Sequence, residues 1–164
     1  GIDYGFTSDP TAIVYAAMLG DDLYFELLMY EPADTSEIIH NYALARDIEY
    51  RRVGVADSSD KYTGENKGTV EMTRELASKG WTLRKVKKTQ SIMFWIGKMK
   101  EKRIHIVHND LAHHARKELE NYTLRKVNGI AINQPIDDFN HFWDAARYAY
   151  MTLDPVNTVR SLSI

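Results

Sequence analysis

The alternation of apolar and polar residues predicts that the chain begins with β-strands. β-Branched and aromatic residues are frequent from Gly1 to Gly5, from Thr11 to Leu19 and from Leu23 to Tyr30. The segments between them, Ser8-Asp9-Pro10 and Gly20-Asp21-Asp22, have the composition of tight turns. The sequence therefore predicts an antiparallel meander of three strands.

Helical and strand-like patterns alternate along the rest of the chain. Apolar residues recur at helical spacing after a cap at Thr35 or Ser36, which predicts a helix to about Tyr50. The mostly apolar run from Arg52 to Asp57 is typical of a strand buried on both faces of a sheet. The later predictions are helices over 69–79, 90–102, 111–122 and 139–153, strands over 81–86 and 103–107, a loop over 61–68, and a hairpin of 123–127 with 129–132.

This order of elements predicts an α/β fold in one domain. It is typical of a mixed β-sheet, an antiparallel meander plus parallel strands, flanked by α-helices. The 164 residues, 44% of them hydrophobic, are enough for one full core. The chain starts at Gly1, directly on a predicted strand, so we expect it to be a piece of a longer protein.

Composition excludes several kinds of site. The chain has no cysteine, which excludes disulfides, thiolate zinc sites and cysteine nucleophiles. No apolar run approaches the roughly 20 residues that a membrane helix needs, so we expect a soluble domain with no membrane partner. His105 and His108 flank a strand-like stretch and would face opposite sides, and the pair His113-His114 has no nearby acid at ligand spacing. The sequence therefore does not favour a zinc site.

A basic segment stands out against the net charge of −2. From residue 84 to residue 103 there are eight lysines and arginines and a single acid, Glu101. Such a segment is often only a solvated face, but it also fits a polyanion such as DNA. The basic residues are Arg84, Lys85, Lys87, Lys88, Lys98, Lys100, Lys102 and Arg103.

Three acids occupy positions where a core or a helix interior would favour other residues. Asp3 lies within the first predicted strand, Asp57 ends the buried strand, and Asp144 lies inside the last helix. Burying an ionised carboxylate without a compensating charge costs several kcal/mol. If the first strand and the strand that ends at Asp57 are neighbours, a right-handed connection brings these two acids together, and the helix can add the third.

Carboxylates this close to one another favour a divalent metal site. Oxygen ligands suit Mg²⁺ or Mn²⁺, which retain waters and share phosphate oxygens with a substrate. Two such ions would support phosphodiester cleavage by an activated water, without a covalent intermediate. We expect Asp9 to be an additional ligand and His141, one turn before Asp144, to contact a ligand or handle a proton.

Each acid also has a purely structural interpretation. Asp3 could pair with a base, Asp57 could cap the turn that follows it, and Asp144 could form an ion pair with Arg147. Asp60 and Asp138 are interpreted as caps.

Several stretches of the chain form a set of motifs in a fixed order. The most specific of them follows His141 and reads Asp144-Ala145-Ala146-Arg147-Tyr148. The others are Gly1-Ile2-Asp3-Tyr4-Gly5 with Asp9-Pro10-Thr11-Ala12, Val55-Ala56-Asp57, and Gln90-Ser91-Ile92 to Lys98-Met99-Lys100 followed by Ile104-His105-Ile106. Together they resemble the C-terminal nuclease domain of the terminase large subunit, the DNA-packaging motor of tailed phages and herpesviruses.

The resemblance implies a ribonuclease H-like fold and a divalent-metal endonuclease that cuts concatemeric viral double-stranded DNA. It also implies an ATPase domain upstream of Gly1, a portal and a small terminase subunit as partners, and a location in the host cytoplasm at the procapsid. By the same resemblance, metal ligation falls on Asp3, Asp57 and Asp144, with Asp9 as an additional acid.

Other function classes stay open at this point. A resolvase or transposase of the same fold would use similar acids. A catalytically silent module that binds DNA or docks on the motor would need only the basic segment. An actin-like ATPase also begins Gly-Ile-Asp-x-Gly, but it needs a second phosphate motif and a second subdomain, which 164 residues cannot hold.

Overall fold

The central element of the computed structural model is a mixed six-stranded β-sheet with the order β5-β4-β1-β2-β3-β6. The structure describes residues 1–57, 69–88 and 90–153. β1 is antiparallel to β2 and parallel to β4, and β6 is parallel to β3, so the predicted mixed sheet is confirmed. The strands are β1 (Ile2–Asp3), β2 (Phe6–Leu19), β3 (Asp22–Ala33), β4 (Gly54–Ala56), β5 (Leu83–Lys85) and β6 (Arg103–Ile106).

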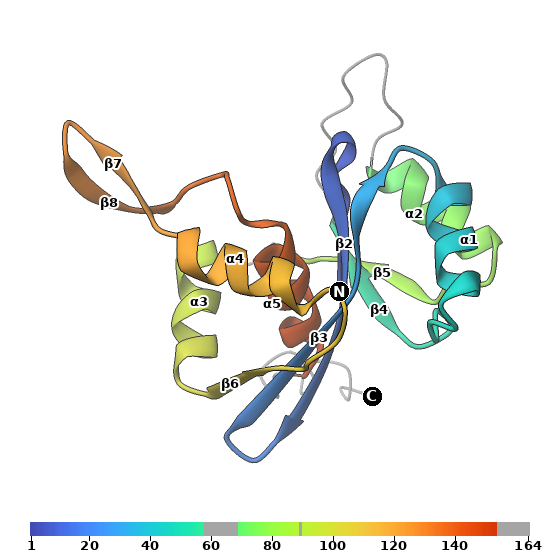
Figure 1. Cartoon of the computed structure of the whole chain (residues 1–164), viewed down its shortest axis with the longest axis horizontal. Coiled ribbons are helices and arrows are strands. Elements are labelled where there is room, and N and C mark those ends of the chain that lie inside the picture. The colour runs from blue at the N-terminus through green and yellow to red at the C-terminus, as the bar shows by residue number, and fades with distance from the viewer. Residues whose placement is uncertain (58–68, 89, 154–164) are drawn as a thin grey trace, which may run out of the picture.

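Helices cover both faces of this sheet (Figure 1). One core lies beneath α1 and α2, and the other beneath α3, α4 and α5. Successive residues of β2 alternate between the two cores: Ala12 and Val14 face one and Ile13 faces the other, as the strand period of two requires. The helices are α1 (Ser36–Ala45), α2 (Thr69–Ser78), α3 (Ile92–Lys100), α4 (Ala112–Asn121) and α5 (His141–Leu153).

Helix α1 begins where the sequence predicts but ends five residues earlier than Tyr50. Thr35 is its N-cap, and the side chain of Thr35 accepts a hydrogen bond from the amide of Ile38. At the other end, Asp47 adopts a left-handed φ of 53°, and the amide of Ile48 donates to the carbonyl of Ala43. This pattern is a Schellman motif, which stops the helix although the apolar spacing continues to Ile48.

The predicted turn at Ser8-Asp9-Pro10 is wrong, because these residues belong to β2. The chain reverses between Asp3 and Ala12, which pair with each other, and within this reversal the amide of Asp9 donates to the carbonyl of Gly5 at 3.3 Å. A Cβ on Gly5 would lie 2.2 Å from the carbonyl oxygen of Asp9. Phe6 follows with a left-handed φ of 57°. The pairing of β2 with β3 is irregular between Phe6 and Thr11, which is the signature of a bulge.

The predicted hairpin is confirmed as a separate two-stranded sheet of β7 (Leu124–Val127) and β8 (Ile130–Pro135), which projects from the body (Figure 1). Asn128 and Gly129 connect its strands with left-handed φ values of 51° and 79°, which is typical of a type I′ turn. The loop predicted over 61–68 lies outside the described residues. Throughout the described part of the chain, every helix is too short or too polar to cross a membrane.

Candidate active site

Two of the candidate acids lie at matching positions on neighbouring parallel strands. Ile2 of β1 pairs with Ala56 of β4, and the amide of Asp57 donates to the carbonyl of Ile2 at 3.1 Å. Asp3 and Asp57 therefore occupy equivalent positions, one residue beyond this pair. Since Ile2 and Ala56 face the core beneath α1 and α2, the side chains of the two acids point to the opposite face, toward α5.

Helix α5 brings the third acid to the same place. A Cβ on Gly1 would lie 1.9 Å from the carbonyl oxygen of Ala145 and 2.6 Å from the amide nitrogen of Ala149. Only a glycine allows β1 and α5 to pack this closely. Asp144, next to Ala145 in the first turn of α5, is thereby held beside the end of β1.

Each of the three carboxylates has a basic or hydroxyl partner. Nδ1 of His141 lies 3.2 Å from Oδ2 of Asp3. A guanidinium nitrogen of Arg147 donates to Asp144 at 2.7 Å. This is the ion pair with Arg147 that the purely structural interpretation of Asp144 predicts.

Two side chains of the described residues contact the same carboxylate oxygen of Asp57. The hydroxyl of Tyr148 donates to Oδ1 of Asp57 at 3.3 Å, and the ammonium of Lys88 lies 2.7 Å from the same oxygen. The side chain of Asp57 is 11% exposed, whereas that of Lys88 is 48% exposed. The ion pair therefore lies at the rim of the site, with Lys88 on its solvent side.

The electrostatics of Asp3 link the three acids. Its side chain is only 13% exposed, and burial raises its pKa from 3.8 to about 6. The negative charges of Asp144 and Asp57 act in the same direction, while the hydrogen bond with His141 opposes the rise. Burial, followed by the charges of the same three carboxylates, raises the pKa of the Tyr148 hydroxyl. The three acids are thus close enough to repel one another.

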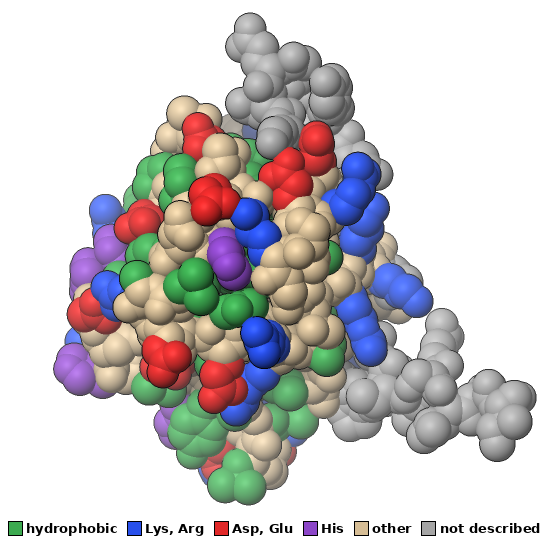
Figure 2. Space-filling model, turned by 90° about the vertical axis from the view of Figure 1, so that its right-hand side faces the viewer, with side chains coloured by type: hydrophobic (Ala, Val, Ile, Leu, Met, Phe, Trp, Pro, Cys, Tyr) green, Lys and Arg blue, Asp and Glu red, His purple; other side chains and the backbone are tan. Residues whose placement is uncertain are grey.

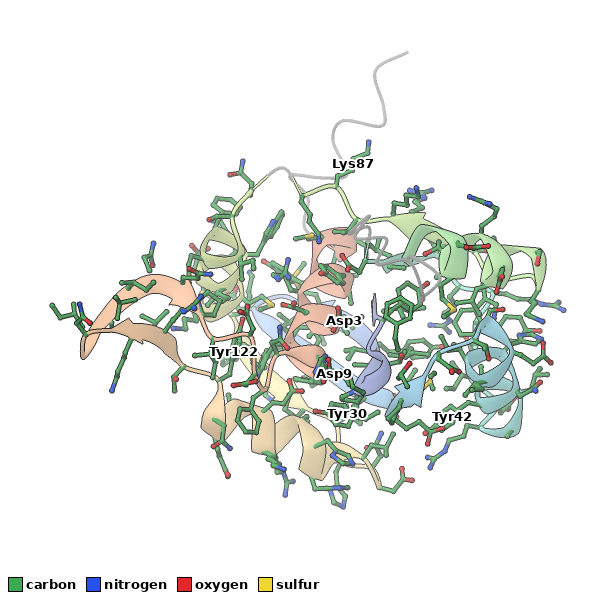
Figure 3. All side chains as sticks on the ribbon, turned by 90° about the horizontal axis from the view of Figure 1, so that it is seen from above. Asp3, Asp9, Tyr30, Tyr42, Lys87 and Tyr122 are labelled. Carbon is green, nitrogen blue, oxygen red and sulfur yellow. The ribbon has the colours of Figure 1, made fainter. Side chains whose placement is uncertain are left out.

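His141 and Asp9 lie on the Asp3 side of the site. Burial lowers the pKa of His141, but its hydrogen bond to Asp3 and the charges of Asp3, Glu118 and Asp9 outweigh that effect, so the pKa is raised overall. Asp9 is exposed on the irregular part of β2. Figure 3 shows Asp3 beside α5, with Asp9 nearby on β2. Asp9 is therefore placed to add negative charge around His141.

The donors fit Mg²⁺ or Mn²⁺ by chemistry, although they are not arranged as a finished ligand set. Within the described residues, no three histidine, aspartate, glutamate or cysteine side chains are grouped so that they could hold a metal ion. The available donors are carboxylate oxygens, which hard divalent cations prefer. Burial and the negative charges of Asp144 and Asp57 together raise the pKa of Asp3. A bound cation would relieve this repulsion between the carboxylates.

Sequence reasoning missed Glu118, a fully buried acid on α4. Its Oε2 accepts hydrogen bonds from the amides of Phe142 and Trp143, at 2.9 and 3.3 Å, in the first turn of α5. Asp138, interpreted from the sequence as a cap, does not receive these amides, and Asp60 lies outside the described residues. The only signal in the sequence is an acid at an otherwise apolar position of an amphipathic helix.

Comparison with protein families gives a match over nearly the whole chain. The sequence model of the family described as "Terminase RNAseH like domain" matches residues 3–151, a range that includes all three acids. The chain belongs to this family. None of the curated proteins compared with it matches.

Solved terminase structures share the fold of this terminase RNase H-like domain. The large terminase nuclease domain of bacteriophage SPP1, solved with bound Mn, has a TM-score of 0.73 and 22% identity, over 94% of this chain and 85% of that one. The P22 large terminase nuclease domain has a TM-score of 0.70 and 14% identity, over 93% and 78%. A large terminase of a thermophilic bacteriophage, in complex with ADP, has a TM-score of 0.64 and 20% identity, over 93% of this chain but 38% of that one.

The basic segment of the terminase domain is divided between the two edges of its sheet. Arg84 and Lys85 lie in β5 at one edge, and Arg103 begins β6 at the other. Lys102 donates to Asp21, and Arg103 forms a two-pronged contact with Asp22. Near the first edge, Lys87 points outward from the body (Figure 3). The basic segment therefore does not form one continuous stripe. Its residues at the β5 edge and at the β6 edge are separated by the sheet, and Lys102 and Arg103 at the β6 edge are paired with acids.

Proposed function

We propose that this terminase RNase H-like domain is a divalent-metal-dependent endonuclease that cleaves viral double-stranded DNA concatemers during genome packaging. The observation that carries the proposal is the meeting of Asp3, Asp57 and Asp144 on one side of the sheet, where burial and mutual repulsion raise the pKa of Asp3. Family membership supports it, and so does the Mn bound in the SPP1 nuclease domain of the same fold.

In this proposal Asp3, Asp57 and Asp144 hold one or two Mg²⁺ or Mn²⁺ ions, and Asp9 contributes to the same negative site. When bound, such ions supply an activated water and neutralise charge on the phosphate. The chain's own residues orient the ligands: His141 holds Asp3, Tyr148 holds Asp57, and Arg147 holds Asp144. Since a cation competes with the existing ion pairs, metal binding requires Lys88 to release Asp57.

The proposed partners follow from the family. The substrate is double-stranded DNA, held by Arg84, Lys85, Lys87, Lys88, Lys98 and Lys100. An ATPase domain upstream in the same protein, a portal and a small terminase subunit complete the machinery, in the host cytoplasm at the procapsid.

A second candidate is a silent module that binds DNA or docks on the motor. It is favoured by one observation, the ion pairs of Asp57 with Lys88 and of Asp144 with Arg147, which already neutralise two of the acids. A nuclease of the same fold that resolves branched DNA is the remaining alternative, and it differs only in its substrate.

Cleavage of supercoiled plasmid separates these functions. We expect nicking and linearisation with Mn²⁺ or Mg²⁺ and none with EDTA. Asp57→Asn should cleave roughly a hundredfold more slowly or worse, because one ligand oxygen loses its charge. Asp21→Asn, in the turn between β2 and β3, is the matched control and should cleave like the parent.

Each alternative predicts a different result in the same assay. DNA binding without metal-dependent cleavage would favour the silent module. Faster cleavage of four-way junctions than of linear duplexes would favour the resolvase. Cleavage by Asp57→Asn at the parental rate would remove the assignment of this site.

A further inference from the structure

A buried carboxylate on α4 is bonded to the start of the helix that carries Asp144. Glu118 is fully buried, and burial raises its pKa. Its Oε2 accepts from the amides of Phe142 and Trp143, and its Oε1 accepts from the hydroxyl of Tyr30 at 2.7 Å. Glu118 therefore connects β3, α4 and α5 through a single side chain.

The start of α5 takes its cap from another helix. The residue before the helix is Asn140, whose carbonyl accepts from the amide of Asp144 at 2.7 Å. Among the side chains that the structure describes, the Oδ1 atom of Asn140 is buried and has no hydrogen-bond partner. The amides of Phe142 and Trp143 would need other acceptors if Glu118 did not reach them from α4.

The two amides held by Glu118 lie between two residues of the candidate active site. His141, the partner of Asp3, precedes Phe142, and Asp144 follows Trp143. Shifting the first turn of α5 would move both residues relative to Asp3 and Asp57, which are fixed by strand pairing. The position of the third carboxylate therefore depends on the acceptor that holds this turn.

We propose that Glu118 is a positioning residue of the nuclease site, which sets the first turn of α5 so that His141 and Asp144 face Asp3 and Asp57. This inference rests on the proposed function, because it assigns Glu118 a role in assembling the same metal site. In this role the length of the Glu118 side chain matters and its charge does not. One of its oxygens must lie within hydrogen-bond distance of the amides of Phe142 and Trp143.

Two substitutions separate reach from charge. Glu118→Gln keeps the length of the side chain and an acceptor oxygen, and loses the charge. Glu118→Asp keeps the charge and withdraws the oxygens by one methylene. Glu120→Asp, at an exposed position of the same helix, is the matched control. Mn²⁺ affinity is measured by electron paramagnetic resonance on the whole chain. Hydrogen exchange at the amides of Phe142 and Trp143 is measured by NMR without metal.

We expect Glu118→Gln to bind Mn²⁺ within about twofold of the parent and to keep both amides protected from exchange. Glu118→Asp should bind Mn²⁺ about tenfold more weakly or worse and lose that protection, while Glu120→Asp matches the parent. Parental affinity in Glu118→Asp, or equal losses in the Gln and Asp variants, would overturn the inference. If the parent itself does not bind Mn²⁺, the proposed function fails instead, and the amide protection still decides whether Glu118 holds the helix start.

Discussion

At the scale of single residues, the three acids of the site have different partners for their negative charges. Asp57 and Asp144 contact the cations of Lys88 and Arg147. Among its described side-chain contacts Asp3 has a histidine, and it is the acid whose pKa is raised to about 6. Burial therefore destabilises the ionised form of Asp3 in the absence of metal.

Removing the charge of Asp3 should stabilise the metal-free protein at neutral and alkaline pH. The pKa is about 6 in the folded chain and 3.8 in the unfolded one, so the folded protein loses stability as the pH rises from 3.8 through 6. At pH 8 the free energy of unfolding of Asp3→Asn should exceed that of the parent by about 3 kcal/mol. Urea denaturation in EDTA measures it.

The stability difference should shrink as the pH falls toward 3.8, because the parent then regains its proton. A difference that is equal at pH 8 and at a pH of about 4.5 would show that Asp3 is not held at a raised pKa. A less stable Asp3→Asn at pH 8 would show that the hydrogen bond to His141 outweighs the burial of charge.

Neutralising Lys88 should strengthen metal binding. Its ammonium occupies Oδ1 of Asp57 and the side chain is 48% exposed, so the ion pair is worth at most about 1 kcal/mol. Lys88→Met should therefore raise the Mn²⁺ affinity about two- to fivefold, measured by titration calorimetry. Lys87→Met, which removes a neighbouring exposed charge, is the control and should change it less. Weaker Mn²⁺ binding by Lys88→Met would mean that Lys88 supports the metal site.

At the scale of elements, backbone conformation determines where the helices begin and end. Asp47 closes α1 in a left-handed conformation that glycine adopts without strain. Asp47→Gly should raise the free energy of unfolding by about 0.5–1 kcal/mol, and Asp47→Ala should not, since its Cβ meets the same strain. Chemical denaturation of both variants measures the difference. Equal stabilities would contradict a Schellman motif at this position.

Some element boundaries could be predicted from the sequence and others could not, for physical reasons. The cap at Thr35 and the turn at Asn128-Gly129 are local, because the residues that form them are neighbours in the chain. The reversal between β1 and β2 depends on the close contact of Gly5 with Asp9 rather than on turn composition. The cap of α5 comes from Glu118, 24 residues away from Phe142, and no local pattern announces it.

The candidate site, like the element boundaries, could be predicted only in part. Asp57 at the end of an apolar strand and Asp3 in a strand are positions that sequence reasoning recognises, and the adjacency of their strands follows from a right-handed connection. The ion pair of Asp57 with Lys88 depends on the path of the chain after β5, which no local rule determines. The roles of these acids in cleavage stay a prediction.

At the scale of the whole molecule, charge is distributed unevenly over the surface. On the face that carries α1 and α2, lysine and arginine side chains form a column along one side (Figure 2). The basic residues of β5 and of the segment after it lie at one edge of the sheet, where Lys88 contacts Asp57. At the other edge, Lys102 and Arg103 contact Asp21 and Asp22. A DNA phosphate would therefore meet less competition at the β5 edge.

Replacing basic residues at the two edges should have unequal effects on DNA binding. Neutralising Arg84, Lys85 and Lys87 together should weaken binding about tenfold or more and lower the slope of log affinity against log salt by about 2–3. The control variant, with Lys102 and Arg103 neutralised, should change both less, because these side chains contact acids. Fluorescence anisotropy over a salt series measures both. Equal effects would contradict a preferred edge.

Anomalous diffraction at the manganese edge, from a crystal of this domain soaked in Mn²⁺, tests directly whether the three acids form a metal site. We expect an anomalous peak in contact with the carboxylates of Asp3, Asp57 and Asp144, and an ammonium of Lys88 that has left Asp57. A peak elsewhere, or no peak with the Lys88 to Asp57 contact intact, would contradict this assignment.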